Sequence, residues 1–120
     1  MAKKILVVED NELNSKLFCD LLRAHGYAAE PVRDGRDVLD RARDYAPDLI
    51  IMDIQLPHVS GIDLIKQIKS EEGLRHIPVM AVTAYASRGY EDQIRAVGAE
   101  TYVSKPISVI KFVETVSAML

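Results

Sequence analysis

Several short segments of the chain have the pattern of buried β-strands. Residues 5–8, 49–52 and 79–82 are apolar throughout and do not alternate with polar residues. Strands that are covered on both faces have this pattern, and the shortness and Val/Ile content of the runs favour strands over pieces of buried helix. Two weaker strands are expected at residues 28–32 and 101–104. The pattern therefore predicts five strands.

Between these segments the apolar positions change to the spacing of amphipathic helices. Asn11 is a suitable N-cap for the first helix, Gly26 and Gly98 suit the ends of the first and fourth, and Pro47 closes the second. The five apolar stripes are Leu13, Leu17, Phe18, Leu21 and Leu22; Val38, Leu39, Ala42 and Ala46; Ile62, Leu64, Ile65 and Ile68; Tyr90, Ile94 and Val97; and Val109, Ile110, Val113, Val116 and Leu120.

The order of elements is strand then helix, repeated five times, which predicts an α/β fold with a parallel sheet covered by helices on both faces. Right-handed crossovers leave few topologies. A common one is the flavodoxin-like (βα)5 doubly wound sheet with strand order 2-1-3-4-5, in which the first and third strands are neighbours and ligands bind at their carboxyl ends. The length of 120 residues suits a single domain over residues 1–120.

The charge and the apolar content of the chain exclude some classes of binding partner. The formal net charge is −3 and no basic run is present, which argues against nucleic acid or an anionic membrane surface. The apolar runs are far shorter than the ~20 residues that span a bilayer, so no membrane insertion is expected. The single cysteine, Cys19, suits a reducing compartment, and we expect a cytoplasmic protein.

Acidic residues follow two of the predicted strands. Glu9 and Asp10 come directly after the first strand, and Asp53 comes directly after the third. If these strands are neighbours, three carboxylates meet at one edge of the sheet and repel one another. A hard divalent cation such as Mg²⁺ removes that conflict, because it prefers carboxylate and carbonyl oxygens.

The other strand ends supply groups of complementary chemistry. Thr83 ends the fourth strand, and Lys105 follows the fifth. A metal ion, an ammonium and a hydroxyl around Asp53 would suit a phosphoryl group, whose transfer depends on positioning and on neutralising oxygen charge. Taken singly, Asp53 could be a turn former, Thr83 a helix cap and Lys105 a surface charge. Their joint occurrence at one edge favours the chemical interpretation.

The sequence resembles the receiver domains of bacterial two-component signalling, from about Lys3 to the C-terminus. The motifs are residues 7–11 (VVEDN), 52–57 (MDIQLP), 60–61 (SG), 82–84 (VTA), 98–99 (GA) and 102–106 (YVSKP). Within that family, residues 8–14, 52–57 and 105–108 look like stand-alone receivers that control cell division and polarity in alphaproteobacteria.

The resemblance implies a role for each matching residue. Asp53 would accept the phosphoryl group. Asp10, Asp53 and the main-chain carbonyl of Gln55 would bind Mg²⁺, with Glu9 helping through water. Lys105 and Thr83 would contact phosphoryl oxygens.

The resemblance also implies a switch and shaped loops. Tyr102 would turn inward when Thr83 moves, which would reshape the face made by the fourth helix, the fifth strand and the fifth helix, where a downstream protein would bind. Pro57 and Gly61 would shape the loop after Asp53. The peptide bond before Pro106 would be cis, which is nearly confined to proline. The positions of Gln55 and Tyr85 are those where receivers tune the lifetime of the phosphoryl group.

The function expected is a phosphorelay protein, not an enzyme, that receives its phosphoryl group from sensor histidine kinases or phosphotransfer proteins. The alternatives are the receiver module of a hybrid kinase and a chemotaxis-type regulator. A phosphatase with an aspartate nucleophile is a weaker alternative, because such enzymes usually carry a second aspartate two residues on, where this chain has Gln55. No phosphate-binding glycine motif of a nucleotide-binding protein occurs.

Overall fold

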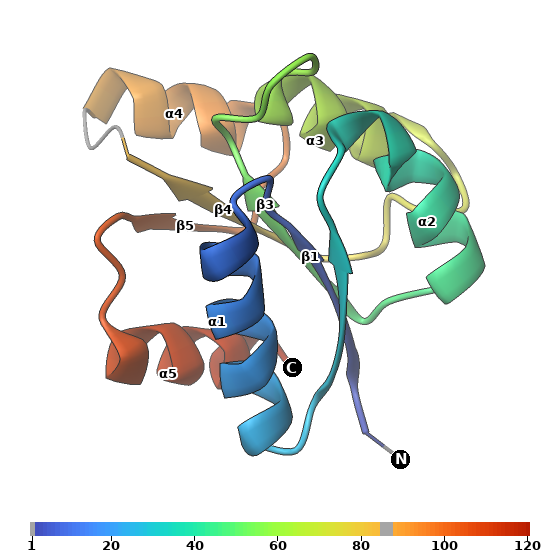
Figure 1. Ribbon diagram of the computed structural model, residues 1–120. Helices are drawn as coiled ribbons and strands as arrows, with labels where there is room; N and C mark the ends of the chain where they lie inside the picture. The colour runs from blue at the N-terminus through green and yellow to red at the C-terminus, as the bar shows by residue number, and fades with distance from the viewer. Residues whose placement is uncertain (1, 85–87) are drawn as a thin grey trace.

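Parallel strands form a central sheet with helices on both of its faces (Figure 1). The computed structural model describes residues 2–84 and 88–120. The strands in these residues are β1 (Lys4–Val8), β2 (Ala28–Val32), β3 (Leu49–Asp53), β4 (Val79–Thr83) and β5 (Thr101–Ser104). The helices are α1 (Glu12–Ala24), α2 (Val38–Tyr45) with a preceding 3-10 turn (Gly35–Asp37), α3 (Gly61–Ser70), α4 (Arg88–Ala96) and α5 (Val109–Met119).

The strands lie in the order β2-β1-β3-β4-β5, and every neighbouring pair is parallel. This arrangement confirms the predicted flavodoxin-like sheet. In the register, Val8 of β1 lies opposite Met52 of β3, and Thr83 of β4 lies opposite Ser104 of β5. The carboxyl ends of β1, β3, β4 and β5 therefore meet at one edge of the sheet.

The core is divided by the sheet into two clusters, which explains the uninterrupted apolar strands. In β1, Ile5 and Val7 face the cluster under α1 and α5, while Leu6 and Val8 face the cluster under α2, α3 and α4. Successive side chains of a strand point to opposite faces, so a strand that is covered on both faces needs apolar residues at every position. In Figure 1, α1 and α5 lie on one side of the sheet and α2 and α3 on the other.

Most predicted helix ends agree with the structure. The Asn11 side chain accepts a hydrogen bond from the Asn14 backbone N–H at 3.0 Å, as an N-cap does. Gly26 and Gly98 follow α1 and α4 with φ angles of 88° and 114°, which glycine adopts without strain. Ala46 was expected on the apolar face of α2, but it caps the helix in the left-handed conformation and is exposed. Among the described residues, no helix is long and apolar enough to cross a membrane.

The buried face of α1 differs from the predicted stripe. Leu13 is 78% exposed and Leu17 is also exposed, although both were placed on the core face. The face that meets the sheet is formed by Ser15, Phe18, Cys19 and Leu22. Leu17 lies two residues, or about 200° of helical rotation, from Cys19, so it points away from the sheet.

The buried face of α5 was also placed wrongly in part, although Val116 of the predicted stripe is buried and Val113 packs against the core. Ile110 is 72% exposed and Val109 is half exposed, whereas Phe112, which was outside the predicted stripe, is fully buried. The Phe112 ring stacks on Phe18 of α1 with centroids 5.2 Å apart. This aromatic pair joins the two helices that cover one face of the sheet.

We expect Phe112→Ala to lower the free energy of unfolding by about 3–5 kcal/mol, because it leaves a cavity where two helices and the sheet meet. The matched variant Ile110→Ala removes an exposed apolar side chain two residues away and is expected to cost no more than about 0.5 kcal/mol. Urea unfolding followed by circular dichroism measures both. Equal losses in the two variants would contradict this description of α5.

Candidate functional site

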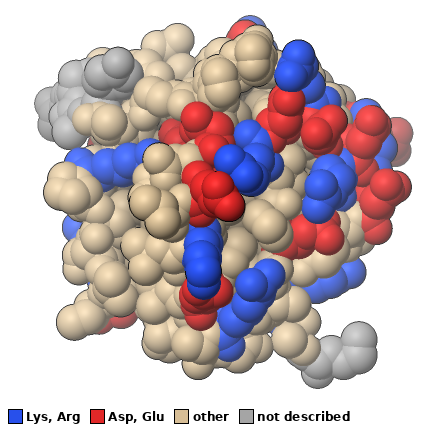
Figure 2. Space-filling model, in the orientation of Figure 1, with Lys and Arg blue, Asp and Glu red and all other residues tan. Residues whose placement is uncertain are grey.

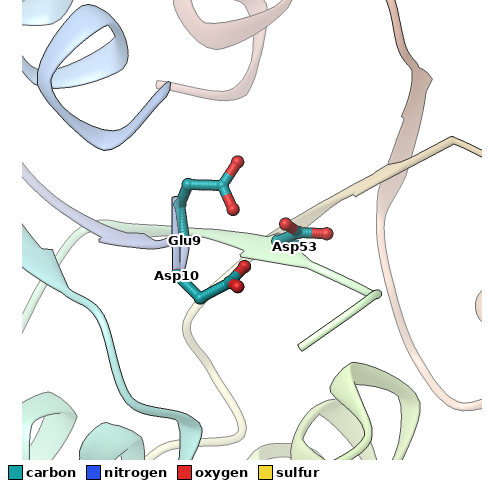
Figure 3. A group of neighbouring side chains, drawn as sticks. All are labelled: Glu9, Asp10 and Asp53. Atoms are coloured by element: carbon teal, nitrogen blue, oxygen red, sulfur yellow. The ribbon is translucent and has the colours of Figure 1, made fainter. Parts of the chain in front are cut away.

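Three carboxylates gather at the carboxyl edge of the sheet. Glu9 and Asp10 follow β1, and Asp53 is the last residue of the neighbouring strand β3. Carboxylate oxygens of the three residues lie within 4.8 Å of one another (Figure 3). Glu9 and Asp53 are buried, whereas Asp10 is partly exposed. The structure thus brings together the three acids whose convergence the strand order predicts.

Lys105 provides the counter-charge from the far side of the site. Its ammonium Nζ lies 3.3 Å from Glu9 Oε1 and 3.3 Å from Asp53 Oδ2. The residue follows β5, and its backbone N–H donates to the Thr83 carbonyl at 2.7 Å, which extends the pairing of β4 with β5. The Lys105–Pro106 peptide bond is cis, as the resemblance implied. Lys105 is therefore held beside two of the three acids.

The site retains an excess of negative charge. Burial raises the pKa of Glu9, and the hydrogen bond and charge of Asp53 raise it further, while the Lys105 ammonium opposes them. Burial acts to lower the pKa of Lys105, but the carboxylates of Asp53 and Glu9 outweigh it and the pKa lies above its ordinary value. One ammonium therefore faces three neighbouring carboxyl groups. A dication among these oxygens would remove the conflict.

Gln55 joins the end of β3 to the end of β4 through its side chain. Its amide Nε2 donates to the Thr83 hydroxyl at 2.8 Å, and its Oε1 accepts from the Ala84 backbone N–H at 2.9 Å. Its own backbone N–H donates to Asp53 Oδ1 at 2.9 Å. Sequence reasoning assigned a role to the Gln55 carbonyl and missed these side-chain contacts, which no local pattern signals.

Thr83 and Tyr102 lie on the adjacent strands β4 and β5. Thr83 is fully buried at the end of β4, where it lies opposite Ser104 of β5. Tyr102 lies opposite Ala81 on β5 and packs against the core cluster under α2, α3 and α4. Burial raises the pKa of Tyr102, as does the charge of Glu91 on α4. Tyr85 lies outside the described residues.

The surface charges do not form a basic face in the view of Figure 2, where Lys and Arg lie among Asp and Glu. Several of them are paired, for example Arg41 with Glu30 at 3.0 Å and Arg43 with Asp40 at 2.8 Å.

Comparison with known proteins identifies this arrangement. The sequence model of the response regulator receiver domain matches residues 5–117. The chain belongs to this family. Receivers signal through phosphorylation, and histidine kinases or phosphotransfer proteins and downstream targets are their partners as a class.

Two relatives within the receiver family are similar to this chain over its whole length. Over 120 residues it is 56% identical to the polar-differentiation response regulator DivK of Brucella ovis and 55% identical to that of Brucella anthropi. Each match covers 100% of this chain and 98% of the relative. These relatives confirm the closer resemblance that residues 8–14, 52–57 and 105–108 indicated.

Solved structures share the fold at lower sequence identity. The chemotaxis response regulator CheY4 of Vibrio cholerae superposes with a TM-score of 0.94 and 26% identity, with 100% of both chains covered. The receiver domain of a sensor histidine kinase from Pseudomonas aeruginosa, described with a magnesium ion coordinated in its active-site cleft, superposes with a TM-score of 0.89 and 29% identity over 99% of this chain and 98% of that one. Identity to DivK thus exceeds identity to the chemotaxis and kinase-linked receivers.

Gly61 shapes the loop that follows the phosphoacceptor candidate in this receiver. A Cβ atom at Gly61 would lie 2.6 Å from the Asp53 carbonyl oxygen and 2.6 Å from Ile54 Cα, because α3 begins directly against this backbone. The Gly61 N–H also donates to the Ile54 carbonyl at 3.2 Å. Pro57 lies exposed in the same loop, and its carbonyl accepts from the Val59 N–H at 2.8 Å.

We expect Gly61→Ala to lower the stability of the receiver by about 1–3 kcal/mol, because the backbone beside Asp53 must shift to admit the methyl group. The amide signals of residues 53–55 in a ¹H–¹⁵N NMR spectrum are expected to move as well. Gly73→Ala is the matched control, since a Cβ atom at Gly73 would meet no other part of the structure within 4 Å. Unfolding curves that coincide for the two variants would be inconsistent with a close approach at Gly61.

Proposed function

We propose that Asp53 accepts a phosphoryl group from a phosphohistidine donor with the help of Mg²⁺, and that the modified receiver acts by changing its contacts with other proteins. The observation that carries this proposal is the position of the Lys105 ammonium, 3.3 Å from Asp53 Oδ2, at an edge where Thr83 also ends a strand. An anionic group attached to Asp53 would find the ammonium already in place, with the Thr83 hydroxyl at the same edge of the sheet.

The donor set at the carboxyl edge suits Mg²⁺. The carboxylates of Asp10 and Asp53 and the main-chain carbonyl of Gln55 would hold the ion, with Glu9 acting through water, and all of these are hard oxygen ligands. When bound, Mg²⁺ supplies positive charge to the oxygens of the transferring phosphoryl group.

The residues of the chain have separate tasks in the transfer. A carboxylate oxygen of Asp53 forms a bond to phosphorus while the bond from phosphorus to the donor imidazole nitrogen breaks, and the electron pair stays on that nitrogen. Lys105 neutralises charge on one phosphoryl oxygen. The Thr83 hydroxyl donates a hydrogen bond to a second phosphoryl oxygen.

The output is proposed to use the face formed by α4, β5 and α5. Two contacts support a route from the site to this face. The Thr83 carbonyl accepts from the Lys105 N–H at the end of β5, and Tyr102 lies on the same strand against the core. A shift of Thr83 toward the phosphoryl group would change the surroundings of Tyr102, as in a two-state switch that phosphate contacts bias.

The biological setting is proposed from the relatives. Identity of 56% to DivK over the whole chain supports a role in cell polarity and cell-division control. A cytoplasmic location belongs to the same proposal, and the free thiol of Cys19 suits it. An aspartate phosphatase is disfavoured, because the residue two positions after Asp53 is Gln55, which has no acid–base group.

We expect Asp53→Asn to abolish phosphoryl uptake from acetyl phosphate and Mg²⁺, because an amide lacks the nucleophilic carboxylate. Intact-protein mass spectrometry measures the modified fraction. Asp63→Asn makes the same change at an exposed position in the first turn of α3 and is expected to leave uptake unchanged. Full uptake by Asp53→Asn would refute the assignment of Asp53.

We expect Mg²⁺ to raise the melting temperature of the receiver, because it binds the folded acidic cluster and not the unfolded chain. Asp10→Asn should weaken Mg²⁺ binding by about tenfold or more through the loss of a charged oxygen ligand. Without metal the variant should be at least as stable as the wild type, because one repelling charge is removed.

Thermal unfolding at a series of MgCl₂ concentrations tests this expectation. Asp44→Asn, at an exposed position of α2, serves as the charge-matched control and should respond to Mg²⁺ as the wild type does. An Asp10→Asn variant with an unaltered Mg²⁺ response would exclude Asp10 as a ligand.

A further inference from the structure

The side chain of Gln55 is hydrogen-bonded to the Thr83 hydroxyl, the group that would contact a phosphoryl oxygen in the proposed function. The Gln55 backbone N–H donates to Asp53 Oδ1 at 2.9 Å, and its side-chain amide reaches the Thr83 hydroxyl at 2.8 Å. Gln55 therefore extends from the acceptor carboxylate to the end of β4, a contact between residues 28 positions apart.

The orientation of the Gln55 amide follows from its partners. The Ala84 backbone N–H can only donate, so the Gln55 atom 2.9 Å away from it must be the carbonyl oxygen. The Gln55 NH₂ group then faces Thr83, and because NH₂ can only donate, the Thr83 hydroxyl oxygen is the acceptor. One planar amide thus engages two consecutive residues at the end of β4.

Movement of Thr83 toward a phosphoryl group would break both of these contacts. Thr83 and Ala84 are consecutive, so a displacement of the strand end carries the hydroxyl and the neighbouring N–H away from Gln55 together. An interaction that is made only in the resting state lowers the apparent affinity of any ligand that needs the other state.

We propose that the side chain of Gln55 is a latch that holds the end of β4 in its resting position, and that phosphorylation of Asp53 must release it. This inference rests on the proposed function. Gln55 acts through Thr83 and Ala84 and is a positioning residue. The Gln55 side chain would shift the equilibrium between the resting and the released position of the end of β4. This effect is separate from any influence of Gln55 on the lifetime of the phosphoryl group.

Equilibrium binding of beryllofluoride with Mg²⁺ tests the latch, because this phosphoryl analogue is not hydrolysed and the lifetime does not enter. Gln55→Met removes both hydrogen bonds and keeps an unbranched side chain of similar length. It should bind beryllofluoride about fivefold more tightly than the wild type, the effect of removing two hydrogen bonds at the weak end of their ordinary net strength that the resting state alone makes.

Matched variants separate the latch from general effects of the substitution. Gln67→Met makes the same chemical change on the exposed face of α3 and is expected to leave beryllofluoride affinity unchanged. Gln55→Asn keeps the amide but is one methylene too short to reach both partners, so it should tighten binding as Gln55→Met does. Agreement between an apolar and a polar replacement would assign the gain to the lost contacts.

Two further measurements test the route through Thr83 and Ala84. In a Thr83→Ala background only the bond to Ala84 remains, so the gain from Gln55→Met should fall to about twofold. In the resting protein, Gln55→Met should speed exchange of the Ala84 amide proton with solvent, observed by NMR. A purely structural role for Gln55 would produce neither the tighter binding nor its dependence on Thr83.

The outcomes distinguish the latch from the function on which it rests. Wild-type protein that binds beryllofluoride at Asp53, together with Gln55→Met and Gln55→Asn variants that bind it no more tightly, would overturn the latch and leave the proposed function intact. Wild-type protein that neither binds beryllofluoride nor takes up phosphoryl from acetyl phosphate would overturn the proposed function and the latch with it.

Discussion

The parallel pairing of β1 with β3 is the constraint on which the rest of the molecule depends. It places Glu9, Asp10 and Asp53 at one edge, where their oxygens lie within 4.8 Å of one another. Burial of Glu9 and Asp53 adds a desolvation cost to this repulsion, and Lys105 offsets only part of it. The fold therefore holds together a cluster of acids that repel one another, and under the proposed function a bound cation would relieve that repulsion.

The end of β4 links the segments that follow its two neighbouring strands. Thr83 receives the Gln55 side chain through its hydroxyl and the Lys105 backbone through its carbonyl, so it contacts segments from both neighbouring strands. A change in the position of Thr83 would alter its contact with Gln55 in the loop after Asp53 and its contact with Lys105 at the end of β5. Because β5 also carries Tyr102, the same residue can connect events at the acidic edge with the face proposed for partner binding.

Local patterns predicted the elements well and the helix faces less well. Each buried strand was evident from its unbroken apolar run, and Asn11 and Gly26 marked the ends of α1, because such signals depend on neighbours in sequence. The faces of α1 and α5 were wrong in part because apolar residues occur on both sides of these helices. Which side is buried depends on how each helix packs against the sheet and against its neighbouring helix, as the stacking of Phe112 on Phe18 shows for α5.

The sequence by itself determined the order of strands and helices and the chemical character of the strand ends, because hydrophobic period and strand boundaries are properties of contiguous residues. Tertiary structure decided the individual contacts that the side chains at these strand ends make. The Lys105–Glu9 contact joins residues 96 positions apart, and the Gln55 amide meets Thr83 through one particular orientation of its side chain. Such contacts depend on the packing of separate elements against one another, which no stretch of neighbouring residues encodes.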